Sequence, residues 1–212
     1  EATERLENAI ELKEVEGLSQ GQIVFRRFIR HKAAMIALIV LVAVILLAIT
    51  SIGVGPIPGW WGKDYVTPFP IVNEARPTIQ FLPPSLGEHP FGQNTIGKDY
   101  FALVMRGLQQ SLFVAFTVGI LATIIGTAVG AIAGYFRGLV EAFLMRTTDL
   151  FIIIPTLVLA AVLGRMTGAN IVTLALVLAL VSWTGLARLV RGEVLSLRER
   201  EFVMAARALG TP

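Results

Sequence analysis

The sequence predicts an all-α polytopic membrane helix bundle with four spans, an irregular extracytoplasmic loop and a cytoplasmic helix. Composition is the first reason, because 55% of the 212 residues are hydrophobic and only 16% are charged, whereas about a quarter of the residues of a soluble domain carry charge. The second reason is that the apolar residues form long uncharged blocks, and the third is that Arg and Lys lie beside those blocks. The chain therefore lacks the polar surface that a soluble domain of this length needs.

Three uncharged blocks are long enough to cross a bilayer. They are residues 33–52, 111–136 and 169–187, with 20, 26 and 19 residues. About 20 residues, each rising ~1.5 Å, cross a hydrocarbon core of roughly 30 Å. A shorter block, 150–164, reaches this length as a span over 145–164, although a buried core helix is its alternative. For the first block a cleavable signal peptide is the alternative, but its apolar stretch exceeds the roughly 7–15 residues of such a signal.

Basic residues beside the spans predict the topology, because Lys and Arg accumulate on the cytoplasmic side of a membrane. Residues 1–32 are expected to form a cytoplasmic N-terminal tail, either mobile or a short surface helix over 1–20, that ends in a basic flank, Arg26, Arg27, Arg30 and Lys32. The other arginines beside the spans follow the second and fourth spans, apart from Arg165 in the outer loop: Arg137, Arg146, Arg188, Arg191, Arg198, Arg200 and Arg207. The protein is thus expected to be multi-pass with a cytoplasmic N-terminus. The net charge of +3 follows from this topology, and no interleaving of basic and aromatic residues indicates nucleic-acid binding.

Residues 53–110 are the largest polar segment and are expected to form the extracytoplasmic loop. The first part is dense in Pro and Gly, which excludes regular helix there. A helical pattern resumes over 97–110 and predicts an interfacial helix on the outer surface, leading into the second span. The chain has no Cys, so neither a disulfide nor a thiolate metal site is expected. No metal site is predicted, and His31 and His89 are expected to be ordinary solvated or hydrogen-bonded histidines.

Two spans contain residues that affect helix packing or shape. Three glycines lie on one stripe of the second span: Gly126, Gly130 and Gly134. This spacing lets another backbone approach the helix closely. Pro155 is expected to kink the third span by removing one backbone hydrogen bond, and the kink is interpreted either as static or as a gating feature.

A candidate ion pair lies near the inner end of the third span. Asp149 follows Arg146 by three residues, and residues at this spacing can share one face of a helix. A proton relay is the alternative, because an intramembrane carboxylate is often functional. At this depth we expect a structural interfacial pair between Arg146 and Asp149.

Residues 188–212 form the predicted cytoplasmic segment after the fourth span. Ser196 and Glu199 fit a capping box, and Gly210 followed by Pro212 marks a helix end, so a helix is predicted over 197–209, about 20 Å long. Its apolar and small residues follow the spacing i, i+3, i+4, i+7: Phe202, Ala205, Ala206 and Leu209. A short helix with this stripe outside the bilayer indicates docking, either to a protein partner or to the base of its own bundle.

Several segments of the chain resemble one transporter family. The run 205–210, Ala-Ala-Arg-Ala-Leu-Gly, resembles the A-A-x-x-x-G core of the cytoplasmic loop in permeases of binding-protein-dependent ABC importers. Further segments resemble the C-type subunit of the dipeptide/oligopeptide/nickel branch: 187–195, 201–203, 89–92, 97–99, 111–112 and 144–146, together with Asp149 and Pro155. The chain departs from the family pattern at Met204 in place of Glu, Gln93-Asn94 in place of Thr-Asp, and Gln109 in place of Arg.

The resemblance implies a permease subunit that forms half of a translocation pathway for di- or oligopeptides, or for a nickel chelate, in the plasma (inner) membrane of a prokaryote. It implies a second permease subunit, cytoplasmic ATPase subunits that bind ATP and Mg, an extracytoplasmic substrate-binding protein and membrane lipid as partners. It also implies that the segment 188–212 couples to the ATPase, through these residues: Glu201, Phe202, Ala205, Ala206, Leu209 and Gly210. Six spans are expected in the complete protein, two of them after Pro212.

Function classes other than an ATP-driven importer are weighed by what the residues offer. The chain has no G-x-x-x-x-G-K-[ST] phosphate loop, so it is not expected to be an enzyme itself, and ATP hydrolysis is expected on a separate subunit. The spans carry almost no charge, which argues against a secondary transporter that binds a coupling ion. A non-transporting membrane scaffold is the third class, and uptake that requires ATP would exclude it.

Overall fold

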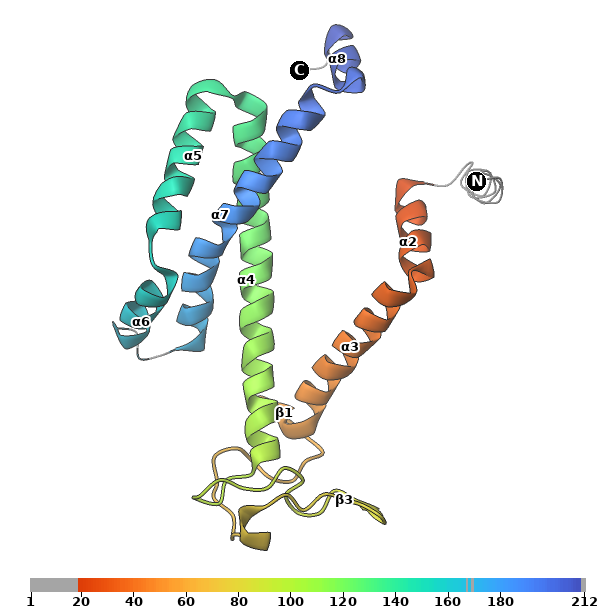
Figure 1. Cartoon of the computed structure of the whole chain (residues 1–212), viewed down its shortest axis with the longest axis vertical. Coiled ribbons are helices and arrows are strands. Elements are labelled where there is room, and N and C mark those ends of the chain that lie inside the picture. Colours follow the sequence, from red (N-terminus) through yellow and green to blue (C-terminus); the bar gives the residue numbers. More distant parts are fainter. Residues whose placement is uncertain (1–18, 167, 169, 211–212) are drawn as a thin grey trace. The chain divides into compact units, whose positions relative to one another are not determined.

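A computed structural model describes residues 19–166, 168 and 170–210 (Figure 1). In this part of the chain helices dominate, and strands occur only as two hairpins with two residues in each strand. The chain divides into two compact units between Arg106 and Gly107. The structure confirms the predicted all-α fold class.

The described part of the first unit begins with two helices joined by one residue, α2 (Gln20–Arg30) and α3 (Lys32–Ile52). A capping box starts α2, because the Ser19 hydroxyl accepts from the Gln22 N–H while the Gln22 side chain accepts from the Ser19 N–H. From the sequence this stretch was predicted as part of the cytoplasmic tail, and α2 was not predicted. His31 separates the two helices, and its Nδ1 accepts a hydrogen bond from the Ala34 N–H at 3.1 Å.

The segment between α3 and α4 (Tyr100–Phe136), called the outer segment after the side of the membrane predicted for it, contains only short elements. Strand β1 (Gly53–Val54) pairs antiparallel with β2 (Ile57–Pro58), with Gly53 opposite Pro58. After the one-turn 3₁₀ helix η1 (Asn73–Ala75), β3 (Gln80–Phe81) pairs with β4 (Pro84–Ser85), with Gln80 opposite Ser85. The rest of the segment is extended or turned. Proline lacks the backbone N–H that regular structure needs, and glycine readily adopts turn conformations.

Helix α4 (Tyr100–Phe136) has 37 residues and contributes to both units. Asp99 caps its start, since Asp99 Oδ2 accepts from the Ala102 N–H at 2.9 Å. The predicted interfacial helix over 97–110 is not a separate element. Its residues from Tyr100 onward form the first turns of α4. No Pro lies within the helix, and the single Gly107 costs only about 1 kcal/mol of helix propensity, so nothing interrupts it before the second span.

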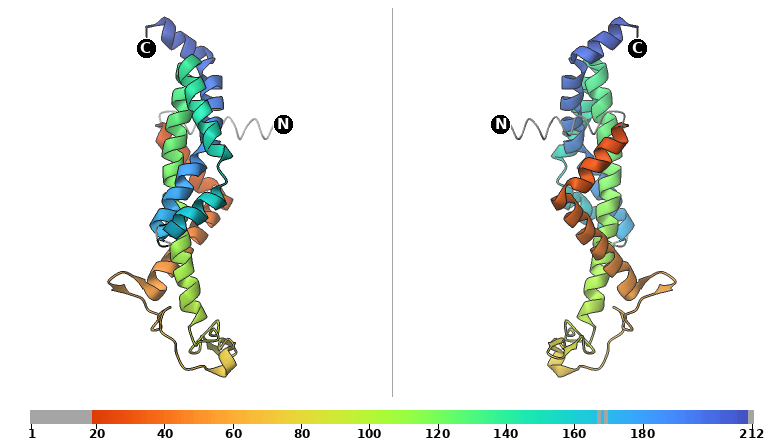
Figure 2. Two further views of the ribbon diagram at one scale, coloured as in Figure 1. Left: turned by 90° about the vertical axis from the view of Figure 1, so that its left-hand side faces the viewer. Right: turned by 90° about the vertical axis from the view of Figure 1, so that its right-hand side faces the viewer.

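The second unit contains α5 (Gly138–Ile153), α6 (Thr156–Met166), α7 (Ile171–Arg198) and α8 (Glu201–Ala208). Arg137, with a left-handed φ of 50°, joins α4 to α5. Helices α5 and α6 are bent by 74° relative to each other at the break that contains Pro155, which confirms the predicted kink. Both α5 and α6 contact α7 (Figure 2).

The described helices fit the predicted number of spans. Three of them, α3, α4 and α7, are long and apolar enough to cross a membrane, and the bent pair α5–α6 supplies a fourth if it counts as one span. The fourth predicted span, 169–187, corresponds to α7, which starts at Ile171 and continues well beyond residue 187. Length and composition therefore agree with a polytopic membrane protein.

The three glycines of α4 face α7 at very short distances. A β-carbon on Gly126 would lie 2.9 Å from the Trp183 carbonyl oxygen, and one on Gly130 would lie 2.5 Å from the Ala187 carbonyl oxygen. Gly134 meets Val194 in the same way. Because no other residue lacks a β-carbon, only glycine permits this separation of the two helices. The predicted packing stripe is confirmed, and α7 is the helix that it contacts.

Candidate functional site

Helix α8 is shorter than the helix predicted over 197–209, and it starts later. Its first residue is Glu201, and the Arg200 carbonyl accepts from the N–H groups of Val203 and Met204 at 3.0 and 3.1 Å. The prediction of a capping box at Ser196 and Glu199 is wrong, because Ser196 lies inside α7 and Glu199 is the residue after its end. A capping Ser needs an extended backbone, whereas packing against α4 keeps the chain helical through this point.

The contacts that extend α7 come from residues far away in the sequence. Val194 packs against Gly134 of α4. The guanidinium of Arg198 donates to the Tyr135 carbonyl and lies over the Tyr135 ring, 5.9 Å from its centroid. The Arg137 guanidinium pairs with Glu199 at 2.8 Å. These contacts hold the last turns of α7, so α8 begins only after a sharp turn at 199–200.

Most of the predicted docking residues of α8 lie on its free surface. Phe202 and Leu209 are 66% and 88% exposed, and Met204, which stands where the family pattern has Glu, is 54% exposed. Glu201 and Ala205 are also exposed, whereas the side chain of Ala206 lies outside the described part. Gly210 has a φ of +89°, which agrees with the predicted left-handed cap. Helix α8 therefore presents apolar side chains with few contacts within the described chain.

Two arginines of α7 pair with two carboxylates of α5 at the end of the bundle nearer α8. Arg188 donates to Asp149 at 2.5 Å, and Arg191 donates to Glu141 through Nε at 2.7 Å and through a second guanidinium nitrogen. The predicted Arg146–Asp149 pair is wrong. In the described part of the chain Arg146 is exposed and has no ion pair, because a guanidinium from the neighbouring helix reaches Asp149 instead.

An open pocket of about 550 Å³ lies beside these pairs, between α5 and α7. It is lined by Gly138, Glu141, Ala142, Met145, Asp149, Arg188 and Arg191. Farther from α8 the same two helices pack directly, with the Phe151 and Trp183 rings 5.5 Å apart. The two helices thus meet through charged groups at one end and through aromatic packing at the other.

A buried polar network, which was not predicted from the sequence, holds the outer segment of the first unit together. Asp99 is fully buried, and its carboxylate accepts from Trp61 Nε1 at 2.9 Å as well as from the start of α4. His89, 1% exposed, bridges Asp99 Oδ1 at 2.7 Å and Lys63 Nζ at 2.8 Å. His89 was expected to be either solvated or hydrogen-bonded, and it is hydrogen-bonded. All polar atoms that meet here have partners, which a buried network requires.

Gln93 performs a similar role beside the network. Its side-chain oxygen accepts from the Val72 N–H at 2.8 Å, and its side-chain nitrogen donates to the carbonyls of Pro70 and Gly97 at 2.9 and 3.1 Å. Gln93 was noted only as a departure from the family pattern. Its amide joins the backbone at Pro70 and Val72, 23 and 21 residues earlier, to the backbone at Gly97, which explains why a long amide side chain fits here.

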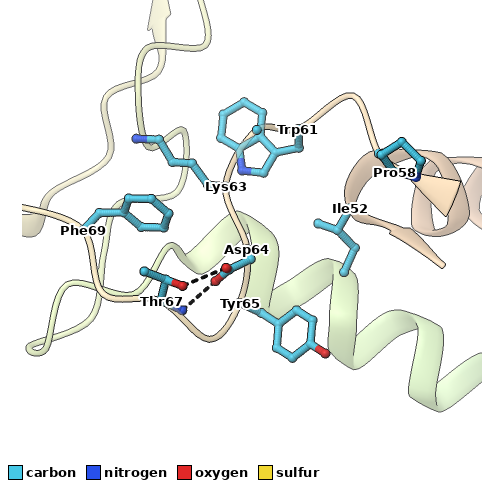
Figure 3. A pocket seen from close by; sticks show the side chains of 10 residues that line it. Ile52, Pro58, Trp61, Lys63, Asp64, Tyr65, Thr67 and Phe69 are labelled. Atoms are coloured by element: carbon cyan, nitrogen blue, oxygen red, sulfur yellow. Dashed lines mark hydrogen bonds between the residues drawn. The ribbon is translucent and has the colours of Figure 1, made fainter. Parts of the chain in front are cut away.

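A pocket of about 480 Å³ lies in the outer segment (Figure 3). Its lining includes Lys63, Asp64, Thr67 and Phe69, and Figure 3 shows Thr67 next to the Asp64 carboxylate. The N–H and hydroxyl of Thr67 and the N–H of Val66 donate to that carboxylate. The backbone N–H of Thr67 is the main cause that lowers the pKa of Asp64 below its usual value, followed by the Thr67 hydroxyl. The Asp64 oxygens are thus used within its own turn.

The described residues contain no group of three or more His, Cys, Asp and Glu that could hold a metal ion. The network around Asp99 contains a single carboxylate and one imidazole, and Lys63 occupies the remaining ring nitrogen of His89. These groups serve as structural hydrogen-bond partners for the loop and for the start of α4.

Residues 126–212 match the family model described as the inner membrane component of binding-protein-dependent transport systems. Residues 19–84 match a second model, the N-terminal transmembrane domain of oligopeptide transport permease C. The two matches together cover most of the chain, including α2, α3 and the unit formed by α5 to α8. The chain belongs to this permease family.

Relatives from three bacteria support membership of the permease family. The chain is 35% identical over 194 residues to the oligopeptide transport system permease protein OppC of Mycobacterium tuberculosis, covering 91% of this chain and 62% of the relative. It is 33% identical over 209 residues to OppC of Haemophilus influenzae, covering 99% and 63%. It is 31% identical over 193 residues to the dipeptide transport system permease protein DppC of Bacillus subtilis, covering 91% and 56%. The chain thus spans about three fifths of the length of these relatives.

Membership of the permease family makes the chain a multi-pass component of an inner membrane, in agreement with its apolar helices. The matched region 126–212 contains the glycine stripe, the bent pair α5–α6 and α8. Residues 85–125 lie outside both matches, and they include His89, Gln93 and Asp99. Of the residues in the buried polar network, Trp61 and Lys63 lie within the second match.

Proposed function

We propose that this chain belongs to the permease subunit of an ATP-driven importer of di- or oligopeptides. In this proposal it forms half of the translocation pathway with a second permease subunit, while separate cytoplasmic subunits bind ATP and Mg and hydrolyse ATP. An extracytoplasmic binding protein delivers the substrate. The observation that carries the proposal is the family match over 126–212, and the names of the relatives as oligopeptide and dipeptide permeases support the substrate class.

The proposed contact with the ATPase is α8 together with its Gly210 cap. Phe202 of α8 and Leu209, the residue after the helix, are exposed and are the type of side chain that fills pockets on a protein partner. Met204 in place of a motif Glu leaves an apolar rather than an ionic side chain there, so the docking proposed here relies on apolar burial. The left-handed backbone at Gly210 turns the chain out of the helix, which keeps α8 a short separate element.

Uptake in proteoliposomes that contain the assembled complex tests the proposed function. The wild-type complex is expected to accumulate peptide only with ATP, which a secondary transporter and a scaffold would not do. Phe202→Asp should lower ATP-driven uptake by more than about tenfold, because losing a central apolar anchor from an interface costs roughly 2 kcal/mol or more. Arg200→Gln, at an exposed residue before α8, is the control and should stay close to wild type. Uptake without ATP, or normal uptake by Phe202→Asp, would contradict the proposal.

We also propose that the N-terminus and α8 face the cytoplasm while the segment between α3 and α4 faces outward. The positions of Arg and Lys support this orientation. The absence of Cys allows a direct test with single cysteines at the exposed residues Glu74 and Arg200. A membrane-impermeant thiol reagent added outside intact cells should label Glu74→Cys and leave Arg200→Cys unlabelled until the cells are opened. Labelling of Arg200→Cys from outside would reverse the topology.

A further inference from the structure

We propose that the two ion pairs between α7 and α5 are positioning contacts that make the bent pair α5–α6 follow α7 when α8 moves. This inference rests on the proposed function, because it assigns a route by which motion from an ATPase reaches the spans. The pairs are Arg188–Asp149 and Arg191–Glu141. This role does not require any of the four residues to contact the ATPase or the substrate.

The arrangement of the four charges places both pairs on one helix interface. Arg188 and Arg191 are three residues apart and share a face of α7. Asp149 and Glu141 are eight residues apart on α5, about 12 Å along the axis, so the long arginine side chains contact α5 at two levels. Contacts at two levels resist both sliding and rotation of α7 against α5, which one pair alone would not do.

The open pocket between the helices shows why charge matters at this end. Around the pairs an open pocket of about 550 Å³ is lined by residues of α5 and α7, so apolar side chains do not close the interface there. Removal of the ion pairs would leave Phe151–Trp183 packing, farther along the helices, as the nearest aromatic contact. The end of α5 nearer α8 would then be free to stay behind when α7 moves.

The contact between α4 and α7 differs in kind. At Gly130 the two backbones are so close that a β-carbon would already clash, and packed contacts of this type permit little relative motion. The side chains of Arg188 and Asp149, in contrast, are 51% and 45% exposed, and exposed ion pairs break and form at little net cost. Arg191 and Glu141 are less exposed, at 35% and 21%, so this pair holds α5 more firmly than the first. A firm pair beside a labile one is suited to an element that holds in one global state and rearranges in another.

A charge-reversal experiment on the assembled complex separates a positioning role from a structural one. The variants are Glu141→Arg, the double swap Glu141→Arg with Arg191→Glu, and the milder Asp149→Asn. Glu193→Arg is the matched control, because Glu193 is exposed on the same helix α7 and has no ion pair in the described part of the chain. The readouts are the amount of peptide transported per ATP hydrolysed and the amount of assembled complex.

We expect Glu141→Arg to lower the number of peptides transported per ATP by about tenfold, within the range of typical coupling between sites, with ATP hydrolysis continuing. The double swap should restore most of this ratio, Asp149→Asn should lower it less, and Glu193→Arg should leave it unchanged. An unchanged ratio in Glu141→Arg, with or without less assembled complex, would overturn the inference, as would a double swap that restores nothing. A wild-type complex without ATP-driven uptake would instead refute the proposed function, and the inference with it.

Discussion

Replacing Gly130 by Val is expected to prevent α4 and α7 from packing and to leave little folded protein in the membrane. A β-carbon at this position lies 2.5 Å from the Ala187 carbonyl oxygen and 2.8 Å from the Val190 β-carbon, well inside the roughly 3.5–4.0 Å of an optimal contact. A backbone carbonyl cannot rotate away as a side chain can. We therefore expect a cost above about 3 kcal/mol, at the upper end of overpacking effects.

The control for this substitution is Gly119→Val on the same helix. Apart from the adjoining backbone of its own helix, no atom of the described chain lies within 4 Å of the place that a β-carbon at Gly119 would occupy. Both substitutions change helix propensity by the same small amount. Membrane yield and the thermal unfolding midpoint of the purified protein in detergent measure the difference. Similar midpoints for the two variants would contradict the close approach of α4 and α7.

The second large effect is expected from Asp99→Asn, which should loosen the outer segment and the start of α4. Three donors converge on the Asp99 carboxylate, from Trp61, His89 and Ala102. An amide offers one acceptor oxygen and turns a donor toward the remaining groups. Because the site is fully buried, a group left without a partner costs about 1–3 kcal/mol, and more where a charge was involved.

Hydrogen exchange measures this loss directly, and we expect faster exchange over 61–63 and 89–102 in Asp99→Asn. Asp64→Asn is the matched control, because Asp64 also accepts backbone hydrogen bonds but lies exposed in a turn of its own. Its effect should stay within residues 64–67. Equal protection of residues 89–102 in the wild type and in Asp99→Asn would show that the network does not hold this segment.

The sequence contained enough information for the spans, for local shape and for packing between small residues. Length and uncharged composition decide whether a helix can cross a bilayer, and a proline such as Pro155 or a stripe such as Gly126, Gly130 and Gly134 acts on its own helix. The start of α8 was not predictable in this way. Ser196 and Glu199 have the residue types of a capping box, but contacts of α7 with Gly134 and Tyr135, about 60 residues earlier, keep the chain helical there.

The ion pairs and the buried network of the outer segment could not be predicted from the sequence, and the physical reason is the same for both. Arg146 and Asp149 lie one turn apart on one helix, yet the partner of Asp149 is Arg188, 39 residues later. Trp61 and Asp99 are 38 residues apart and belong to segments whose approach depends on the whole loop. Composition and spacing identify such residues as polar and unusual, but only the fold determines which of them meet. The start of helix α2, in contrast, was predictable from the sequence, because Ser19 and Gln22 form a local capping box.

The break between α5 and α6 limits what can surround that part of the bundle. Where a helix ends within a membrane, its last carbonyls and the first N–H groups of the next helix lose their intrahelical partners. Hydrocarbon chains cannot solvate these groups, so broken backbone at membrane depth is found only where protein or water covers it. If α5 and α6 together form one span, the side of the bundle on which Ile154 and Pro155 lie cannot face lipid. That side must face either another protein surface or an aqueous passage.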